Sequence, residues 1–140
     1  MFKNILVPTD LSEKSSRALE IALDMAEKRG DCRVTFLHVI ERIEDSDDEE
    51  FQSFYDKLAS KARQKMNETV KHYSHRKAEI DNEIVFGNRV GEIVDFAYKH
   101  AIDLIILSSH KLDKMDAVQD WATISYKVGI LAPCPVMMVK

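Results

Sequence analysis

Lys3-Asn4-Ile5-Leu6-Val7-Pro8-Thr9-Asp10 is the stretch that decides the fold of this chain. Its short apolar run ends in small polar residues, which is typical of a buried parallel strand that meets its loop. A second run of this kind, Leu104-Ile105-Ile106-Leu107, ends in Ser108-Ser109-His110. Loops after two such strands can meet at the crevice where open α/β sheets bind ligands. We therefore expect a crevice between these two loops.

Strand and helix patterns alternate between and around these runs. Short β-branched or aromatic runs predict strands at about residues 4–7, 33–40, 80–86, 104–107 and 136–139, and we expect Pro8 to stop the first of them. Helical patterns are predicted from Ser12, as the N-cap, to about residue 29, then at about 49–75, after 87–91, and before Pro133. This order requires right-handed crossovers and predicts a mostly parallel sheet with helices on both faces.

Apolar residues spaced by three or four predict the buried faces of the helices. The long helix at 49–75 gives the clearest signal, with Phe51, Phe54, Leu58, Ala62, Met66, Val70 and Tyr73. The next helix is predicted to point Val90, Ile93, Val94, Ala97 and Ala101 inward. The last helix is predicted to carry Ala117, Trp121, Ile124, Val128 and Leu131 on one stripe.

Composition narrows the class of protein. A length of 140 residues predicts one domain with a proper core. The net charge of −4 argues against nucleic acid as the main partner, because nucleic acid binds a basic protein face. No apolar run is long enough to cross a bilayer and no signal peptide is recognised, so we expect a cytoplasmic protein without a membrane partner. Cys32 and Cys134 are then expected to be reduced packing residues.

Two polar segments allow two interpretations each. Residues 41–50 are acidic and predict a solvated loop or, alternatively, an interaction surface. His72 and His75 lie three residues apart on a helix, as two metal ligands can, but the basic residues around them favour a helix end that complements the dipole. His38 lies in a predicted buried strand and is interpreted as a satisfied core histidine.

Taken in order, these motifs resemble a universal stress protein domain over essentially the whole chain. The resemblance is carried by residues 5–10 with Ser12, 36–39, Gly87 with 91–93, 103–107 with His110, and 127–128 followed by 132–136. It implies one Rossmann-like domain over residues 1–140, of the adenine nucleotide alpha hydrolase-like type, with an open five-stranded sheet in the order 3-2-1-4-5. It also implies a homodimer formed by the last strand, Val136, Met137, Met138 and Val139.

The nucleotide-binding members of this family carry a glycine-rich loop after the fourth strand, and this chain departs from it at every glycine. Ser108 stands at the first glycine position and Lys111 at the second, while Ala122-Thr123 falls at the third glycine and its hydroxyl partner. Side chains there occupy space that backbone needs to approach a phosphate. Carboxylates in the same loop repel a polyphosphate unless a metal intervenes. The pattern predicts weakened or lost nucleotide binding.

If binding is retained, the resemblance places ATP or AMP, with Mg²⁺, against the residues Pro8, Thr9, Asp10, Val39, Gly87, Leu107, Ser108, His110, Lys111 and Thr123. Asp10 is interpreted either as a ligand residue or as an acid that favours the start of a helix. Ser12 is interpreted as a cap rather than a nucleophile, because no partner base is recognised. Thr123 is either a phosphate ligand or a helical hydroxyl that bonds a neighbouring turn.

Three hypotheses for function follow. The first is a dimeric stress-response regulator that acts through its surfaces on protein partners. The second is an ATP- or AMP-binding member that signals through nucleotide occupancy. The third is an enzyme with slow nucleotide hydrolysis, which no general base, metal cluster or Walker-type loop in the sequence supports. No catalytic or metal-binding residue is assigned.

Overall fold

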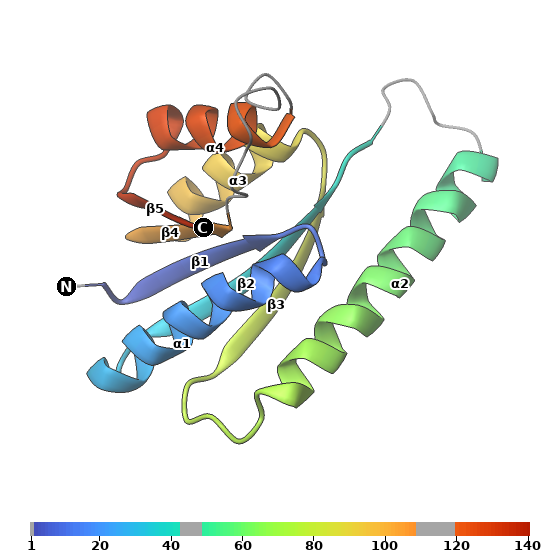
Figure 1. The fold of residues 1–140 in the computed structure, drawn as a ribbon. Coiled ribbons are helices and arrows are strands. Elements are labelled where there is room, and N and C mark those ends of the chain that lie inside the picture. The colour runs from blue at the N-terminus through green and yellow to red at the C-terminus, as the bar shows by residue number, and fades with distance from the viewer. Residues whose placement is uncertain (1, 43–48, 109–119) are drawn as a thin grey trace.

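The computed structural model describes residues 2–42, 49–108 and 120–140, and leaves out the side chains of residues 120–123. Five strands and four helices alternate along the chain (Figure 1). The strands are β1 (Asn4–Thr9), β2 (Arg33–Ile40), β3 (Ile80–Phe86), β4 (Leu104–Ser108) and β5 (Val136–Val139). The helices are α1 (Ser16–Arg29), preceded by the short 3-10 helix η1 (Glu13–Ser15), and α2 (Glu49–His72), α3 (Arg89–Lys99) and α4 (Asp120–Leu131).

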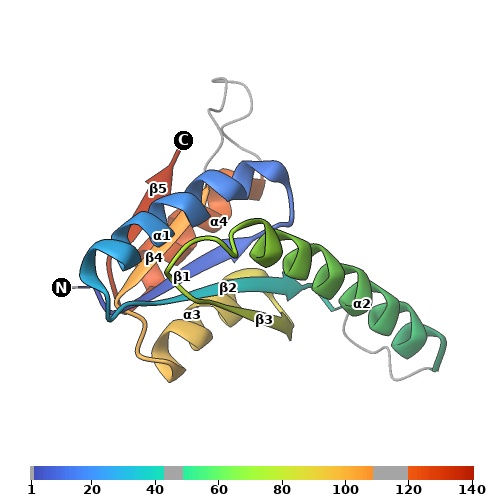
Figure 2. The ribbon, with the colours of Figure 1, turned by 90° about the horizontal axis from the view of Figure 1, so that it is seen from below.

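All five strands form one parallel sheet in the order β3-β2-β1-β4-β5. This confirms the predicted open α/β sheet and its strand order. Helices α1 and α2 cover one face and α3 and α4 the other (Figures 1 and 2). The strand order reverses at β1, which is the central strand, so loops after β1 and β4 leave toward opposite faces.

The core consists of two apolar clusters, one on each face of the sheet. Alternate residues of a strand point to opposite faces, so the same strands supply both clusters. Ile5, Val7 and Phe36 pack toward α1 and α2, where Leu19 and Met66 are fully buried. The opposite cluster combines Leu6, Leu37 and Ile105 from the strands with Ile93 and Val128 from α3 and α4. The central strands therefore read as continuous apolar runs.

The start of β1 is fixed by Asp103, an acid 100 residues later in the chain. The Asp103 carboxylate accepts the backbone N–H groups of Lys3, at 2.8 Å, and Asn4, at 3.1 Å. In the other direction, the N–H of Asp103 donates to the Asn4 carbonyl at 3.0 Å. These bonds join the first residues of β1 and β4 and set the register between the two strands.

The prediction that Pro8 stops the first strand is wrong. β1 continues to Thr9, with Pro8 opposite Leu37 of β2. On its other side, β1 pairs with β4 only at Ile5 and Leu6. Pro8 thus lies where the strand has a neighbour on one side, and a missing N–H is tolerated at such edge-like positions.

Two residues predicted to point inward are exposed. Ala101 lies beyond the end of α3 and adopts a left-handed φ of 51°. Leu131 is the last residue of α4 and is 53% exposed, whereas Val128 one turn earlier is fully buried. Periodicity predicted the helices but extended their buried stripes beyond the sheet that covers them. Ala117 and the Trp121 side chain lie outside the described residues.

The stripe predicted on α2 is buried only in part. Ala62 and Met66 are buried as predicted, and so is Tyr73, which follows the helix. Phe51, Phe54 and Leu58 are exposed, and Tyr55, which the analysis of spacing did not select, is buried in their place. None of the described helices has both the length and the apolar character needed to cross a membrane.

The chain after α2 is attached to α1 by charged side chains. The Arg76 guanidinium binds the carboxylates of Glu27, at 2.8 Å, and Asp24, and the backbone N–H of Lys77 donates to Glu27 at 3.0 Å. Bonding to Arg76 is the largest cause that lowers the pKa of Glu27 to about 2, against the opposing effect of burial. Arg76 therefore joins the segment after α2 to α1. The basic end of α2 that the sequence analysis favoured is formed by Lys71 and His72 in its last turn.

Candidate functional site

The carboxyl ends of β1 and β4, where the sequence predicts the crevice, meet beside η1. Thr9 ends β1 and is buried, with its hydroxyl 2.7 Å from the Ser15 hydroxyl. The same Thr9 oxygen accepts the backbone N–H of Leu11 at 2.9 Å. Thr9 therefore supports the loop from inside, and its polar atoms already have partners within the protein.

Asp10 bonds to the turn that follows it. Its Oδ1 accepts the backbone N–H of Ser12 at 2.9 Å and the Ser12 hydroxyl at 2.6 Å. Leu11 between them adopts φ 67°, a conformation that costs energy for a residue other than glycine. These bonds fit the interpretation of Asp10 as an acid at the start of a helix.

The prediction that Ser12 caps the helix ending near Arg29 is wrong: Ser12 precedes η1, and the N-cap of α1 is Ser15. The Ser12 backbone is extended, with φ −79° and ψ 160°, and its side chain forms no cap hydrogen bond. The hydroxyl donates to the Asp10 carboxylate at 2.6 Å, a charge-assisted bond that holds the Ser12 side chain toward Asp10. Sequence spacing does not distinguish a helix cap from this local partner.

Ser108 joins the two sides of the strand reversal. It ends β4, and its hydroxyl donates to the Lys14 carbonyl of η1 at 3.1 Å. Leu107 before it is buried among the residues on the α3 and α4 face. Ser108 therefore lies at the crevice, and its side chain holds the loop that carries Asp10.

His38 lies next to the crevice on β2. Its Nδ1 is 2.9 Å from the Thr9 carbonyl oxygen, and since a carbonyl only accepts, Nδ1 carries the proton. Burial lowers the pKa of His38, the bond to Thr9 opposes this, Arg89 lowers the pKa further and Asp10 raises it. The neutral ring fits the predicted role of a satisfied histidine, although the side chain is only half-buried.

Gly87 has a structural role in this geometry. It follows β3 with φ 148°, and its N–H donates to the Ile40 carbonyl at 3.0 Å. A Cβ atom there would lie 2.5 Å from the Glu92 carboxylate, so another residue would force Glu92 to move. Asn88 caps α3 by accepting the N–H of Gly91 at 3.0 Å. The sequence analysis did not select Asn88, although an Asn just before a helical pattern is a cap signal.

The structure tests only part of the predicted nucleotide site. Asp10 and Ser108 are brought together around η1, and Val39 is buried on β2. Gly87 lies farther out, after the edge strand β3. His110 and Lys111 lie outside the described residues, as does the Thr123 side chain.

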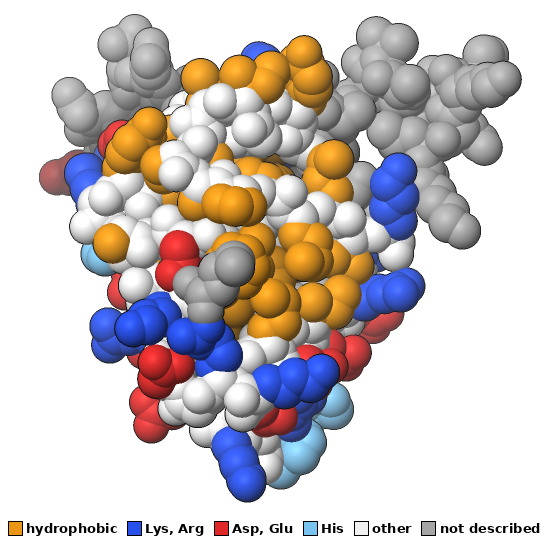
Figure 3. Space-filling model, turned by 90° about the vertical axis from the view of Figure 1, so that its left-hand side faces the viewer, with side chains coloured by type: hydrophobic (Ala, Val, Ile, Leu, Met, Phe, Trp, Pro, Cys, Tyr) orange, Lys and Arg blue, Asp and Glu red, His pale blue; other side chains and the backbone are white. Residues whose placement is uncertain are grey.

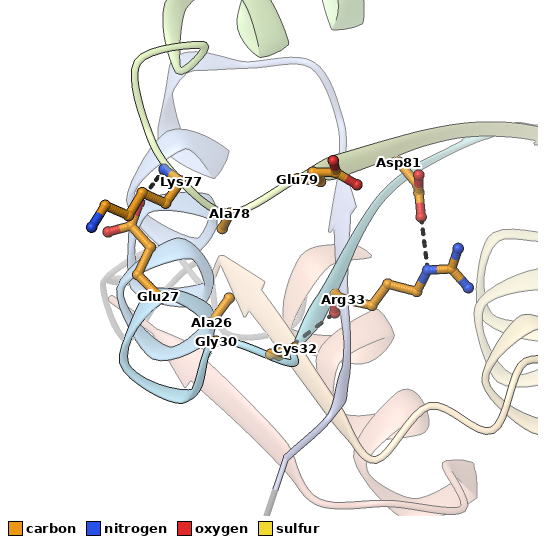
Figure 4. A pocket seen from close by; sticks show the side chains of 9 residues that line it. All are labelled: Ala26, Glu27, Gly30, Cys32, Arg33, Lys77, Ala78, Glu79 and Asp81. Atoms are coloured by element: carbon orange, nitrogen blue, oxygen red, sulfur yellow. Dashed lines mark hydrogen bonds and ion pairs between the residues drawn. The ribbon is translucent and has the colours of Figure 1, made fainter.

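A pocket of about 410 Å³ opens at the opposite end of the sheet, beside the starts of β2 and β3 (Figure 4). Three of its charged side chains have partners within the protein: Glu27 is bound to Arg76, and Arg33 lies 3.2 Å from Asp81. Burial raises the pKa of the Cys32 thiol, which makes this free cysteine less reactive. Among the described residues, no three His, Cys, Asp or Glu side chains are placed to hold a metal ion.

A second pocket of about 470 Å³ lies between α1 and α2. Thr9 and Phe36 contribute to it from the sheet, and Lys65 and Tyr73 from the side of α2. The Tyr73 hydroxyl donates to Glu20 of α1 at 2.8 Å. Burial, followed by this bond, raises the pKa of Tyr73 to about 12, so it is a neutral hydrogen-bond donor at physiological pH.

The universal stress protein family model matches residues 1–140. The universal stress protein UspA from Lactobacillus plantarum is 25% identical, with a TM-score of 0.84 over 99% of this chain and 98% of that one. A universal stress protein from Archaeoglobus fulgidus in complex with dAMP is 20% identical, with a TM-score of 0.72 over 99% and 98%. A universal stress protein family protein from Arabidopsis thaliana with AMP bound is 20% identical, with a TM-score of 0.71 over 99% and 91%. No curated protein sequence matches the chain.

These likenesses cover nearly all of the chain rather than a fragment of it. The observed strand order, with β1 at the centre and the reversal between β1 and β4, is the order that the sequence resemblance implied. The family match extends over all five strands and over the crevice between them. The chain belongs to the universal stress protein family.

Proposed function

We propose that this chain is a regulatory universal stress protein whose crevice binds adenine nucleotide weakly or not at all, and which acts through its surfaces. The observation that carries the proposal is the absence of glycine from the loop after β4. Ser108, Lys111 and Ala122 stand at the three glycine positions of nucleotide-binding relatives. Backbone amides approach phosphate closely only where side chains leave room.

The described side of the crevice supports the same conclusion. The Asp10 carboxylate holds the Ser12 amide and hydroxyl, and the Ser108 hydroxyl holds the Lys14 carbonyl. A ligand that used either side chain would compete with these internal bonds. Displacing such a bond without replacing it costs free energy, so the affinity for the ligand falls.

An ATP- or AMP-binding protein that signals through occupancy is the second candidate. The Archaeoglobus and Arabidopsis structures, which hold dAMP and AMP, favour it. In this candidate the Lys111 cation and the Thr123 hydroxyl bind the phosphates in place of the backbone amides that a glycine loop exposes. Mg²⁺ offsets the negative charge of the loop carboxylates. We do not propose that the protein is an enzyme. The contrary result would be ATP turnover in clean protein that Asp10→Ala abolishes.

Nucleotide content and affinity separate the two candidates. Protein purified gently and then denatured should release no stoichiometric nucleotide, and calorimetry with ATP and Mg²⁺ should show no tight binding. Restoring glycine with the double change Lys111→Gly and Ala122→Gly should raise the affinity at least tenfold, because the amides can then reach the phosphates. Lys127→Gly, an exposed position later in α4, is the matched control. Near-stoichiometric adenine nucleotide in the unmodified protein would overturn the proposal.

We propose that the chain forms a homodimer through β5. Among the described residues, β5 pairs with β4 alone, and no other described strand lies at its second edge. Met137 is 37% and Met138 53% exposed, and Tyr126, Ile130 and Leu131 of α4 are also exposed. Apolar side chains gather on the face of the molecule that carries these elements (Figure 3). An apolar open edge favours aggregation unless it is covered, and pairing with a second β5 covers it.

The mass of the protein in solution tests this dimer. At micromolar concentration, light scattering coupled to gel filtration should give at least twice the mass of one chain, and Met137→Lys should reduce it because a charge enters the apolar seam. Tyr98→Lys, at a position of α3 that is more exposed than Met137, should leave the mass unchanged. A monomer in the unmodified protein would overturn the proposal.

A further inference from the structure

The amino-terminal half of α2 carries exposed aromatic residues that are not part of the crevice or of β5. Phe51 is 44%, Phe54 55% and Leu58 36% exposed, and Phe86 at the end of β3 is 40% exposed. We call these four residues the α2 patch. The first three follow one another at helical spacing, so they lie along one edge of the helix. Figures 1 and 2 both show this end of α2 standing away from the rest of the molecule.

Aromatic contacts hold the patch in place. Tyr55 is buried at its centre, with its ring 5.5 Å from that of Phe54 and 6.4 Å from that of Phe86, both edge to face. The Arg42 guanidinium lies 5.5 Å from the centre of the Tyr55 ring and donates to Gln52 at 3.1 Å. A surface that is already ordered loses little conformational entropy when a partner binds.

The exposed apolar area of the α2 patch is large enough for a protein–protein contact. A whole aromatic side chain presents roughly 150–250 Å², so the exposed fractions leave about 300 Å² of apolar surface. This is the size of the largest patch on a typical soluble monomer, and such patches are often interaction sites. It suits the apolar centre of an interface at the small end of the usual range.

Charges on the same helix decide which partner fits. Glu49 and Glu50 begin α2 on the amino side of the patch, and Lys57 and Lys61 lie at and beyond its carboxyl side. All four side chains are exposed. A partner that is basic throughout would meet Lys57 and Lys61, and one that is acidic throughout would meet the glutamates. The complementary surface carries opposite charges at its two ends, in the reverse order.

We propose that the α2 patch binds the α2 patch of a second copy of this chain, with the two helices antiparallel and crossing near Phe54. Such a crossing packs Phe51, Phe54 and Leu58 of one copy on those of the other. It also places Glu49 and Glu50 of each copy beside Lys57 and Lys61 of its partner. The contact is two-fold symmetric, and is therefore satisfied by identical chains.

The surface is separate from β5, so the two contacts act independently. If both form, each chain has two different neighbours and the protein assembles beyond a dimer. If β5 does not pair, the α2 contact still gives a dimer. Association through α2 should be weak, because the buried area lies at the small end of specific interfaces.

The first test changes the apolar centre. Sedimentation equilibrium over a range of protein concentrations should show self-association that Phe54→Glu weakens at least tenfold. Tyr98→Glu, on an exposed aromatic residue of α3, is the matched control and should have no effect. Each variant is also made with Met137→Lys, so that pairing through β5 does not mask the result. An unchanged association constant in Phe54→Glu would overturn the proposal.

The second test changes only the charges. A chain with Glu49→Lys and Glu50→Lys is basic at both ends of the patch, and a chain with Lys57→Glu and Lys61→Glu is acidic at both ends. Each alone should associate at least tenfold more weakly, because like charges meet. An equal mixture of the two should restore association through mixed pairs. If the mixture behaves like its separate components, the antiparallel contact is wrong.

Discussion

The two halves of α2 are parts of one helix with one apolar periodicity, yet they meet different surroundings. In the carboxyl half, Met66 is fully buried, and the chain that follows is bonded to α1 through Tyr73 and Arg76. In the amino half, Phe51 and Phe54 are exposed, and Tyr55 is the buried aromatic anchor. The difference shows that a regular apolar stripe predicts a helix, whereas burial depends on where the rest of the fold ends.

Truncating one apolar side chain of the stripe in each half should give the largest contrast. Met66→Ala should lower the free energy of unfolding by about 2–5 kcal/mol, because it leaves a cavity in the α1 and α2 cluster. Phe54→Ser should change it by no more than about 0.5 kcal/mol, since the ring is 55% exposed. Urea unfolding of the two variants measures both values. Equal losses would mean that the halves contribute alike to the core.

Removing the charged connection should have the next largest effect. Arg76→Ala takes the partner from Glu27 and Asp24, so the melting temperature should fall by a few degrees. Gln52 bonds to Arg42 in the amino half and takes no part in this connection, so Gln52→Ala is the matched control. A larger loss from Gln52→Ala would reverse the contrast between the halves.

The same connection gives a pH dependence. The pKa of Glu27 is lowered from 4.5 to about 2 in the folded protein, so the unfolded chain takes up the proton first. Its contribution to stability is full above pH 4.5 and is lost as the pH falls toward 2. Unfolding by urea at about pH 6 and about pH 3 should show a smaller difference in Arg76→Ala than in the unmodified protein. An equal pH dependence would assign the acid sensitivity to other groups.

Removing one hydroxyl should have a smaller effect. Tyr73→Phe keeps the ring and deletes the bond to Glu20, so unfolding should become easier by about 1 kcal/mol. Tyr55→Phe is the comparison in the amino half of α2. The absorbance of ionised tyrosine during alkaline titration provides a second readout, because the pKa of Tyr73 is raised to about 12. Loss of a late-ionising component in Tyr73→Phe identifies that group.

The smallest effect is expected at His38, which lies outside both halves and serves as a reference. The pKa of His38 is lowered in the folded protein. Its contribution to stability is therefore full above the unfolded pKa of 6.5 and is lost as the pH falls below that value. His38→Gln should flatten the melting temperature between about pH 7 and about pH 5. The profile of Arg76→Ala should keep its slope in this range.

The fold was predictable because it depends on patterns that recur along the chain. Apolar runs predicted β2, β3 and β5 at their observed residues, since buried strands need continuous or alternating apolar side chains. The errors arose where burial or pairing depends on neighbours that are distant in the sequence. Pro8 is tolerated because β1 has already lost β4 as a neighbour there, and Leu131 is exposed because the described part of the chain does not cover the end of α4.

The candidate site was less predictable, because it depends on which of several local partners a polar group chooses. Asp10 and Ser12 were both recognised. The sequence does not reveal that the Asp10 carboxylate accepts hydrogen bonds from both the backbone N–H and the hydroxyl of Ser12. The bond from Ser108 to the Lys14 carbonyl joins residues 94 positions apart. Such a contact follows from the strand order and not from any local motif.

The central position of β1 has a consequence for how the protein is made. A ribosome delivers β1, β2 and β3 first, but β4 and the Asp103 carboxylate that accepts the Lys3 amide arrive 100 residues after their partner. During that interval one side of the central strand is an open template for pairing with other chains. The nascent chain is therefore most exposed to aggregation late in its synthesis, just before β4 emerges and closes the sheet.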